Sequence, residues 1–260
     1  MREDFRKILL NREAKKKMLA VLLDPDKCQG LTLASTIAAL KTKEPDLIFI
    51  GGSLASVTTH SLIEILKEEV KSKVVLFPGN ASQFAPNADA LLFISLISGR
   101  NPDYLIGQQV LAAKAIKNSD VEIIPTGYIL VDGGKVSATE YISNTRAIPR
   151  DQKDILVSTA LAGELLGMHA IYLEAGSGAK EHVPADLIKR VSEEIEVPLI
   201  VGGGIRSVED LGACYEAGAD IVVIGNFFEE HPEKILDFVE FTEEYSAKLQ
   251  EESEPNYLLP

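Results

Sequence analysis

Short apolar runs of strand length alternate with longer segments of mixed polarity along this chain. The apolar runs cover residues 18–23, 47–52, 74–77, 90–98, 121–131, 170–178, the start of 197–207, and 221–224. Apolar positions at helical spacing occupy 31–41, 59–70, 103–118, 154–167, 184–194 and the segments that follow 207 and 235. Such alternation is typical of consecutive strand and helix units that build a parallel sheet. Eight of these units predict an α/β protein with the (β/α)8, or TIM, barrel fold.

One of these units is too short to carry its helix. Only residues 81–89, with Pro86 among them, separate Asn80 from the fourth predicted strand. A covering helix of about three turns does not fit into that length. We therefore expect the third helix of the barrel to be absent or vestigial. The resulting thin place in the outer ring could hold a long apolar ligand, or neighbouring elements could simply fill it.

Three other segments stand apart from the strand and helix units. Residues 2–17 mix charged and apolar residues at helical spacing, which predicts an N-terminal helix covering the bottom of the barrel. Residues 132–149 form the longest predicted loop, on the face where barrel enzymes carry their active sites. A loop of this length is commonly a lid or a binding loop. The acidic tail, about 247–260, is expected to fray.

Length and charge restrict the class of protein. A chain of 260 residues suits one barrel domain over 1–260, since such barrels have roughly 250 residues. The formal net charge of -13 argues against nucleic acid as a partner. Cys28 and Cys214 lack metal-ligand or redox spacing and fit a reducing cytoplasm. The most apolar run, 90–98, is less than half of a membrane span of about 20 residues, so we expect no transmembrane segment.

Glycine-rich turns follow the last three predicted strands. They are Gly176-Ser177-Gly178, Gly202-Gly203-Gly204 and Gly225-Asn226. Without side chains, backbone N–H groups can approach an anion closely. Ser207 and Asp210 have the spacing of a capping box, so a helix N-terminus should follow the second turn. Because the carboxyl ends of barrel strands meet on one face, the turns predict a phosphate site there; tight packing alone is the competing explanation.

Three polar residues follow or end other strands on the same face. Asp24 and Ser53 come directly after the first two strands, and a carboxylate with a hydroxyl can hold Mg²⁺. The competing explanation is that Asp24 only caps a turn. Glu174 is a carboxylate on an otherwise apolar strand, which requires a cation, hydroxyl donors or a catalytic task. No lysine ends a predicted strand, which disfavours Schiff-base chemistry, and the four histidines are too scattered for a metal site.

The chain resembles the geranylgeranylglyceryl phosphate synthases, prenyltransferases of ether-lipid synthesis, which are related to bacterial heptaprenylglyceryl phosphate synthases. The similarity runs over most of the sequence. The motifs that carry it are Leu23-Asp24-Pro25-Asp26-Lys27, Gly51-Gly52-Ser53, Phe77-Pro78-Gly79-Asn80, Ser98-Gly99-Arg100-Asn101-Pro102, Tyr172-Leu173-Glu174-Ala175-Gly176-Ser177-Gly178, Gly202-Gly203-Gly204-Ile205-Arg206 and Gly225-Asn226. The glycine motif before Arg206 is shared by many phosphate-binding barrels, whereas the combination is specific.

The resemblance implies both the ligands and the residues that bind them. Asp24 and Ser53 would hold Mg²⁺. The residues expected to bind sn-glycerol 1-phosphate are Tyr172, Leu173, Glu174, Ala175, Gly176, Ser177, Gly178, Gly203, Gly204, Gly225 and Asn226. Geranylgeranyl diphosphate would be the second substrate, and a homo-oligomer, either a dimer or a hexamer, is expected. The heptaprenyl relatives carry a lysine where this chain has Leu22, which favours the geranylgeranyl branch.

A mechanism follows from the resemblance and from the residue types. The magnesium site, aided by Lys27 or Arg100, would stabilise the departing diphosphate. Glu174 is the expected catalytic base for the glycerol hydroxyl, and Tyr172 would position the glycerol. Two other classes stay open at this point: another phosphate-binding barrel enzyme, such as a phosphosugar isomerase or an amino-acid biosynthesis synthase, and a non-catalytic sensor of phosphoglycerol or prenyl ligands.

Overall fold

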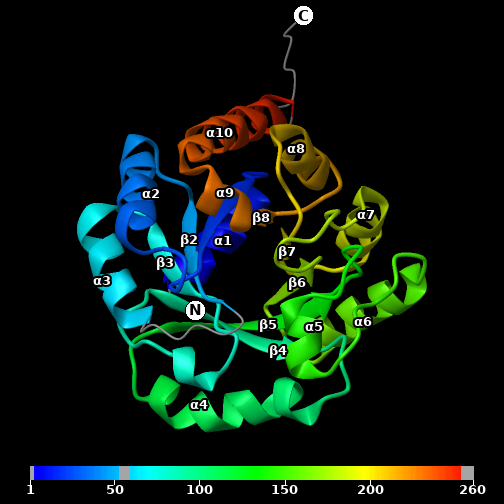
Figure 1. Cartoon of the computed structure of the whole chain (residues 1–260). Helices are drawn as coiled ribbons and strands as arrows, with labels where there is room; N and C mark the ends of the chain where they lie inside the picture. The colour runs from blue at the N-terminus through cyan, green and yellow to red at the C-terminus, as the bar shows by residue number, and fades with distance from the viewer. Residues whose placement is uncertain (1–2, 53–58, 253–260) are drawn as a thin grey trace, which may run out of the picture.

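The computed structural model describes residues 3–52 and 59–252, and these form one closed parallel barrel (Figure 1). Within them, each strand pairs with the next in chain order and the last pairs with the first, which confirms the predicted TIM barrel. The strands are β1 (Met18–Leu23), β2 (Leu47–Ile50), β3 (Lys73–Leu76), β4 (Ala90–Leu96), β5 (Glu122–Leu130), β6 (Ala170–Glu174), β7 (Leu199–Gly202) and β8 (Ile221–Ile224).

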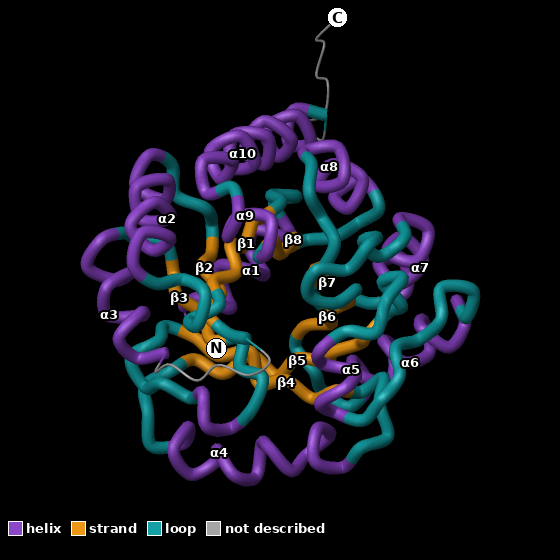
Figure 2. The backbone as a smooth tube through the Cα atoms, viewed as in Figure 1, coloured by secondary structure: helices purple, strands orange, loops and turns teal. Residues whose placement is uncertain are grey.

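Helices surround the barrel and connect its strands, as the tube in Figure 2 shows. They are α1 (Glu3–Glu13), α2 (Gly30–Thr42), α3 (Thr59–Glu69), α4 (Gln108–Lys117), α5 (Ala138–Ser143), α6 (Lys153–Leu165), α7 (Ala185–Glu194), α8 (Val208–Glu216), α9 (Asn226–Glu230) and α10 (Ile235–Glu251). Three short helical turns complete the set: η1 (Ala81–Gln83), η2 (Asp103–Gly107) and η3 (Pro232–Lys234). Among the described helices, none is long and apolar enough to span a bilayer.

Apolar side chains fill two separate layers. Alternate strand residues point inward, and Phe49, Leu92 and Tyr172 belong to the apolar cluster inside the barrel. The intervening residues, such as Ile48 and Leu173, pack outward against the helices. Strands buried on both faces explain why the sequence shows nearly continuous apolar runs rather than a strict alternation.

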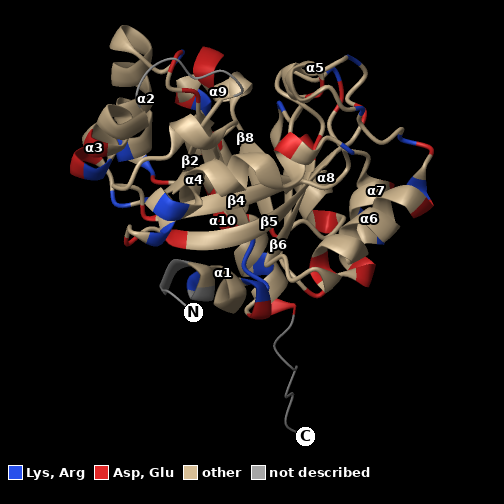
Figure 3. Cartoon of the chain, turned by 90° about the horizontal axis from the view of Figure 1, so that it is seen from below, with Lys and Arg blue, Asp and Glu red and all other residues tan. Residues whose placement is uncertain are grey.

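The N-terminal helix covers one end of the barrel. Phe5 and Ile8 of α1 are buried against the inward-facing side chains, and the Phe5 N–H donates to Glu122 Oε2 at 3.1 Å. Figure 3 shows α1 below the barrel and α5 and α9 at the opposite end. This confirms the predicted position of the helix, although it ends at Glu13 instead of residue 17. The end that carries α5 and α9 is therefore the one open to ligands.

The helix that should follow β3, which is the third of the barrel's eight strand and helix units, is vestigial, as predicted. Between β3 and β4 the chain forms only η1, a single 3₁₀ turn started by Asn80, whose side chain accepts a hydrogen bond from Ser82 N. The two strands on either side are also paired over a short distance. Within the described residues their register contains two positions, Val75 with Ala90 and Leu76 with Leu91. The β4–β5 register contains seven.

The structure corrects three local expectations. The long segment 132–149 is not a plain loop, because it contains α5, with a full capping box between Ser137 and Glu140. The helix expected over 103–118 begins with the π-helical turn η2 before α4 continues it. Ser207 accepts from Asp210 N as expected, but the Asp210 carboxylate accepts from Arg206 N, so the second bond of the predicted capping box is displaced by one residue.

Candidate active site

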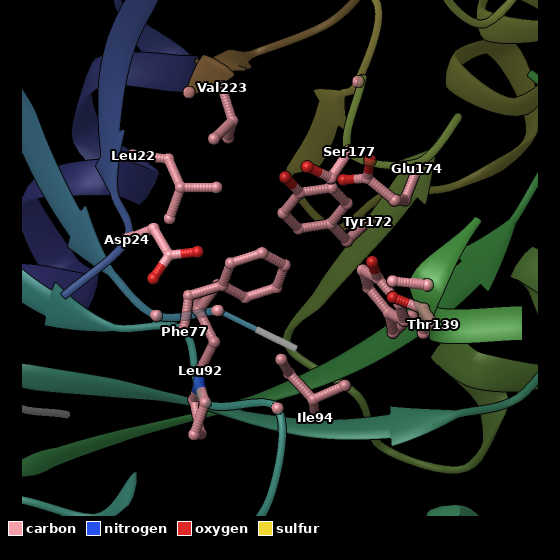
Figure 4. Close-up of a pocket in the computed structure, with 18 of the residues that line it drawn as sticks. Leu22, Asp24, Phe77, Leu92, Ile94, Thr139, Tyr172, Glu174, Ser177 and Val223 are labelled. Atoms are coloured by element: carbon pink, nitrogen blue, oxygen red, sulfur yellow. The ribbon is translucent and has the colours of Figure 1, made fainter. Parts of the chain in front are cut away.

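A cavity of about 500 Å³ lies at the carboxyl ends of the strands. Its polar part is lined by Asp24, Tyr172, Glu174, Ser177, Gly178, Gly203, Gly204, Gly225 and Asn226. These come from the turns after β1, β6, β7 and β8, and from β6 itself. In Figure 4, Asp24 lies on one side of the cavity, and Glu174 and Ser177 lie on the other. The structure thus brings together most of the residues that the sequence selects, and the cavity is large enough for a small ligand.

The three glycine turns form a cradle of unpaired donors. Within the described part of the chain, six backbone N–H groups of these turns donate to no protein acceptor: those of Ser177, Gly178, Gly203, Gly204, Gly225 and Asn226. The Ser177 hydroxyl donates to Asn226 Oδ1 at 2.8 Å, which links the turns after β6 and β8. Adjacent unpaired N–H groups make an anion-binding concavity. This cradle is the strongest physical argument for a phosphate site.

Two positions in the turn after β7 require glycine. Gly203 and Gly204 have φ angles of +85° and +77°, in the left-handed region that other residues rarely adopt. A Cβ added at Gly203 would lie 2.5 Å from Glu174 Oε1 and 2.7 Å from Gly176 N. The turn therefore packs its bare backbone directly against Glu174, and it leaves its N–H groups available to a ligand.

Glu174 is a buried carboxyl group, 6% exposed, at the end of β6. It accepts a hydrogen bond from Gly176 N at 2.7 Å. Burial raises its pKa from 4.5 to about 7, although the Gly176 N–H and the nearby Tyr172 hydroxyl act in the opposite direction. The fully buried Tyr172 hydroxyl faces this carboxyl, and within the described residues it has no hydrogen-bond partner of good geometry. Since its pKa lies near neutral pH, Glu174 can exchange a proton with a bound hydroxyl.

Aromatic rings form a wall between the two polar sides of the cavity. Phe77 stacks on Tyr172 with ring centroids 5.1 Å apart and an interplanar angle of 4°. Tyr128 contacts both rings edge-on, at 5.8 Å and 5.2 Å. The wall is seen in Figure 4, where Phe77 lies between Asp24 and Tyr172. Sequence reasoning named Tyr172 as a site residue but not its two aromatic neighbours, whose position depends on strands that are distant in the sequence.

Asp24 stands at the end of β1 with one carboxylate oxygen committed to its own turn. Its Oδ1 accepts from Asp26 N at 3.0 Å, whereas Oδ2 has no protein donor among the described residues. Asp24 therefore does cap a turn, and it also presents an oxygen to the cavity. Ser53, the second expected Mg²⁺ ligand, lies outside the described residues. Mg²⁺ commonly takes one or two carboxylates and completes its shell with water and substrate phosphate, so the free oxygen of Asp24 fits such an ion.

Two of the basic residues near the site are already engaged. Lys27 lines the cavity and forms an ion pair with Glu229, at 2.9 Å from Nζ to Oε2. Burial raises the pKa of Glu229, with Lys27 acting against that shift and Asp24 adding to it. Arg100, the other cation considered from the sequence, donates to the carbonyls of Ile97 and Gly99 and is absent from the cavity lining. Of the two, only Lys27 is therefore placed to meet a ligand.

Three expected substrate-binding residues do not line the cavity. The side chains of Leu173 and Ala175 point away from it into the outer core, where both are buried. Gly176 has its N–H bonded to Glu174. These residues shape the turn through their backbone, and the side chains of Leu173 and Ala175 do not face a ligand in the cavity.

The apolar part of the cavity lies where the third helix is missing. It is lined by Phe84, Phe93, Ile94, Tyr104, Ala112 and Ile116, which come from β4, the segment after η1, η2 and α4. The cavity thus continues from the mouth of the barrel past β4, into the space that a covering helix would otherwise fill. The expectation of an apolar groove at this place is confirmed.

Comparison with known proteins agrees with this site. Residues 11–243 match the model of the PcrB family. This chain belongs to the PcrB family. A geranylgeranylglyceryl phosphate synthase from Chitinophaga pinensis is 46% identical over 234 residues, covering 89% of this chain and 92% of the relative. A synthase of the same name from Korarchaeum cryptofilum is 40% identical over 233 residues, covering 89% and 96%. The family is one of prenyltransferase enzymes, as the resemblance in the sequence indicates.

A solved structure with the same fold agrees with the family assignment. The (S)-3-O-geranylgeranylglyceryl phosphate synthase from Thermoplasma acidophilum, in complex with its substrate sn-glycerol-1-phosphate, matches with a TM-score of 0.82 and 31% identity. The match covers 92% of this chain and 99% of that one. The barrel fold of this chain is therefore also that of a solved geranylgeranylglyceryl phosphate synthase.

Proposed function

We propose that this enzyme transfers the geranylgeranyl group of geranylgeranyl diphosphate to the C3 hydroxyl of sn-glycerol 1-phosphate in a reaction that depends on Mg²⁺. The observation that carries the proposal is that one cavity joins a cradle of unpaired N–H groups, a buried carboxyl with a pKa of about 7, and an apolar groove. The similarity to synthases of that name, one with sn-glycerol 1-phosphate bound, supports the same assignment. A phosphosugar isomerase or an amino-acid biosynthesis synthase would have no substrate that requires the apolar groove.

The cradle would bind the phosphate of the glycerol substrate. Its N–H groups donate without any need to reorganise, which favours an anion at this position. The glycerol would then extend toward Glu174 and Tyr172, which lie beside the cradle. Glu174 is proposed to hold the C3 hydroxyl and accept its proton, and Tyr172 is proposed to orient the glycerol.

The prenyl donor would lie on the other side of the aromatic wall. Its hydrocarbon tail would fill the apolar groove beside β4, and its diphosphate would face Asp24 and Lys27. Positive charge that develops on the allylic carbon is stabilised by aromatic rings, and Phe77 and Tyr172 are the rings between the two polar sides. Mg²⁺, held by Asp24 and Ser53, would supply charge stabilisation for the departing diphosphate.

The test is product formation from radiolabelled geranylgeranyl diphosphate, sn-glycerol 1-phosphate and Mg²⁺. The wild-type enzyme should form labelled ether product, and Asp24→Asn and Glu174→Gln should each lower turnover by about 100-fold or more without unfolding the barrel. Asp186→Asn, on the exposed surface of α7, is the matched control and should leave turnover unchanged. Wild-type rates in both site variants would contradict the proposed roles. Consumption of a sugar phosphate instead would favour a different barrel enzyme.

Assembly and cellular location are part of the same proposal. A dimer or hexamer is supported by exposed apolar side chains on α4, where Val110 and Leu111 are 66% and 74% exposed. Light scattering coupled to size-exclusion chromatography measures the mass of the oligomer directly. A monomeric mass would contradict the proposed dimer or hexamer. A cytoplasmic location is supported by Cys28 and Cys214, both of which are free and buried.

A further inference from the structure

The segment between β5 and α6 packs directly against the phosphate turn. A Cβ added at Gly133 would lie 2.1 Å from the Ala175 carbonyl oxygen, and the Gly133 carbonyl accepts a hydrogen bond from Lys180 N at 2.9 Å. A Cβ added at Gly176 would lie 2.7 Å from Cβ of Ser137. The two segments therefore fit together backbone to backbone. Residues 133–137 are held at a fixed place beside the cradle.

Lys135 is an exposed residue of this segment, and its ammonium group lies beside the turn after β6. A Cβ added at Gly178 would lie 3.1 Å from Lys135 Nζ and 3.5 Å from Asn226 Nδ2. Gly178 and Asn226 line the cavity, and the Gly178 N–H has no protein acceptor in the described residues. The missing side chain of Gly178 thus leaves room for an ammonium group beside two other hydrogen-bond donors.

The ammonium group of Lys135 is not neutralised by the protein. Over residues 3–52 and 59–252, it forms no ion pair and no hydrogen bond. By contrast, the cations that line the cavity are engaged: Lys27 pairs with Glu229, and the Arg206 guanidinium donates to the carbonyls of Ala179, Lys180 and Gly204. A free cation among free N–H donors, in a chain of net charge -13, needs an anion.

We propose that Lys135 is a phosphate-binding residue of the glycerol phosphate site, which takes a phosphate monoester through a backbone cradle closed by one ammonium group. The inference rests on the proposed function for the identity of the ester. It gives the β5–α6 segment a specific task, because the segment delivers the charge that the glycine turns themselves lack. An ammonium group bonded to a phosphate oxygen forms a charge-assisted hydrogen bond, stronger than one to a neutral donor.

The first test is binding of sn-glycerol 1-phosphate alone, by titration calorimetry, without prenyl donor. Lys135→Gln should weaken binding by about tenfold or more. Inorganic phosphate, measured the same way, should lose affinity in parallel. Lys189→Gln, an exposed lysine of α7, is the matched control and should bind as the wild type does. Because Lys135 is exposed, the variant is expected to keep the wild-type melting temperature, which is measured alongside.

Steady-state kinetics and chemical labelling separate a binding role from a structural one. Lys135→Gln should raise KM for glycerol phosphate and leave KM for the prenyl diphosphate unchanged. Acetylation of surface amines, followed by mass spectrometry, should show Lys135 protected by sn-glycerol 1-phosphate and Lys189 unprotected. Wild-type affinity in Lys135→Gln would overturn this inference and leave the proposed function intact. A wild-type enzyme that binds no sn-glycerol 1-phosphate would overturn both.

Discussion

The Ser177 hydroxyl donates a hydrogen bond to the side-chain oxygen of Asn226, at 2.8 Å, across 49 residues of sequence. The bond fixes the amide so that Nδ2 is directed toward Gly178 and the cradle. In Ser177→Ala the amide is free to rotate, so KM for glycerol phosphate should rise about three- to tenfold while kcat changes little. Initial rates at varied glycerol phosphate test this. Ser35→Ala, an exposed hydroxyl on α2, is the control, and an unchanged KM in Ser177→Ala would contradict the role.

The pH dependence of turnover should follow the ionisation of the Glu174 carboxyl group. A catalytic base acts only when ionised, and the pKa of this carboxyl is about 7 because it is buried. The rate at saturating prenyl diphosphate should therefore rise through about pH 7 and level off above it. Glu174→Gln should lose this limb along with most of the activity. A wild-type profile that is flat between pH 5.5 and 8.5, taken here as about the range of the titration, would exclude Glu174 as the base.

The same carboxyl should affect stability in the opposite direction. Its pKa is raised from 4.5 to about 7 on folding, so the folded state binds more protons between these values. Its favourable contribution is complete below about pH 4.5 and is lost as pH rises to about 7, a decline of up to about 3 kcal/mol. Urea denaturation of the ligand-free enzyme at pH 5 and pH 8 measures it. Glu174→Gln should show a smaller decline, and equal declines in both proteins would contradict the burial argument.

A pair of glycine substitutions separates backbone conformation from contact. Gly203 and Gly167 have φ angles of +85° and +87°, but an added Cβ at Gly167 would meet no described residue within 4 Å. Gly167→Ala should therefore cost only about 1 kcal/mol. Gly203→Ala should cost a further roughly 1–3 kcal/mol because its Cβ would collide with Glu174, and it should abolish binding of glycerol phosphate. Denaturant melts and calorimetry distinguish the two, and equal effects would show that the contact is unimportant.

A substitution that introduces one large side chain should block the apolar groove. Ala112 is buried on α4 and lines the apolar part of the cavity, whereas Ala113 beside it is exposed. Ala112→Phe should lower turnover of geranylgeranyl diphosphate at least tenfold and favour shorter prenyl diphosphates, because the ring would occupy the space of the tail. Ala113→Phe should behave as the wild type. Unchanged chain-length preference in Ala112→Phe would place the tail elsewhere.

The barrel could be predicted from the sequence because its periodicity is local. Each strand is a short apolar run, and β1 was predicted over residues 18–23, as found. The absence of the third helix followed from length alone, since residues 81–89 cannot contain it. The helix α5 was missed because a six-residue element gives too little periodicity, although Ser137 and Glu140 carry the spacing of a capping box.

The site was predictable only as far as strand order places strand ends together. Asp24, Glu174 and the glycine turns converge for that reason. Side-chain partners could not be predicted in the same way: the ion pair of Lys27 with Glu229 joins the turn after β1 to α9, and Lys135 reaches the cradle from another segment. Gly178 is the clearest example: the sequence predicts an anion-binding turn there, but it does not predict that Lys135 lies beside this glycine.

The short pairing between β3 and β4 has a consequence for motion. The β3–β4 register has two positions, whereas the other described strand pairs have three or more. This pair of strands also borders the groove left by the vestigial helix. Breaking these two positions and the two hydrogen bonds between Asp89 and Val74 would let β3 and β4 separate while the rest of the barrel stays closed. Backbone amides of β3 and β4 should accordingly exchange with deuterium sooner than those of β5 and β6, and a bulky lipid should enter or leave through that flank.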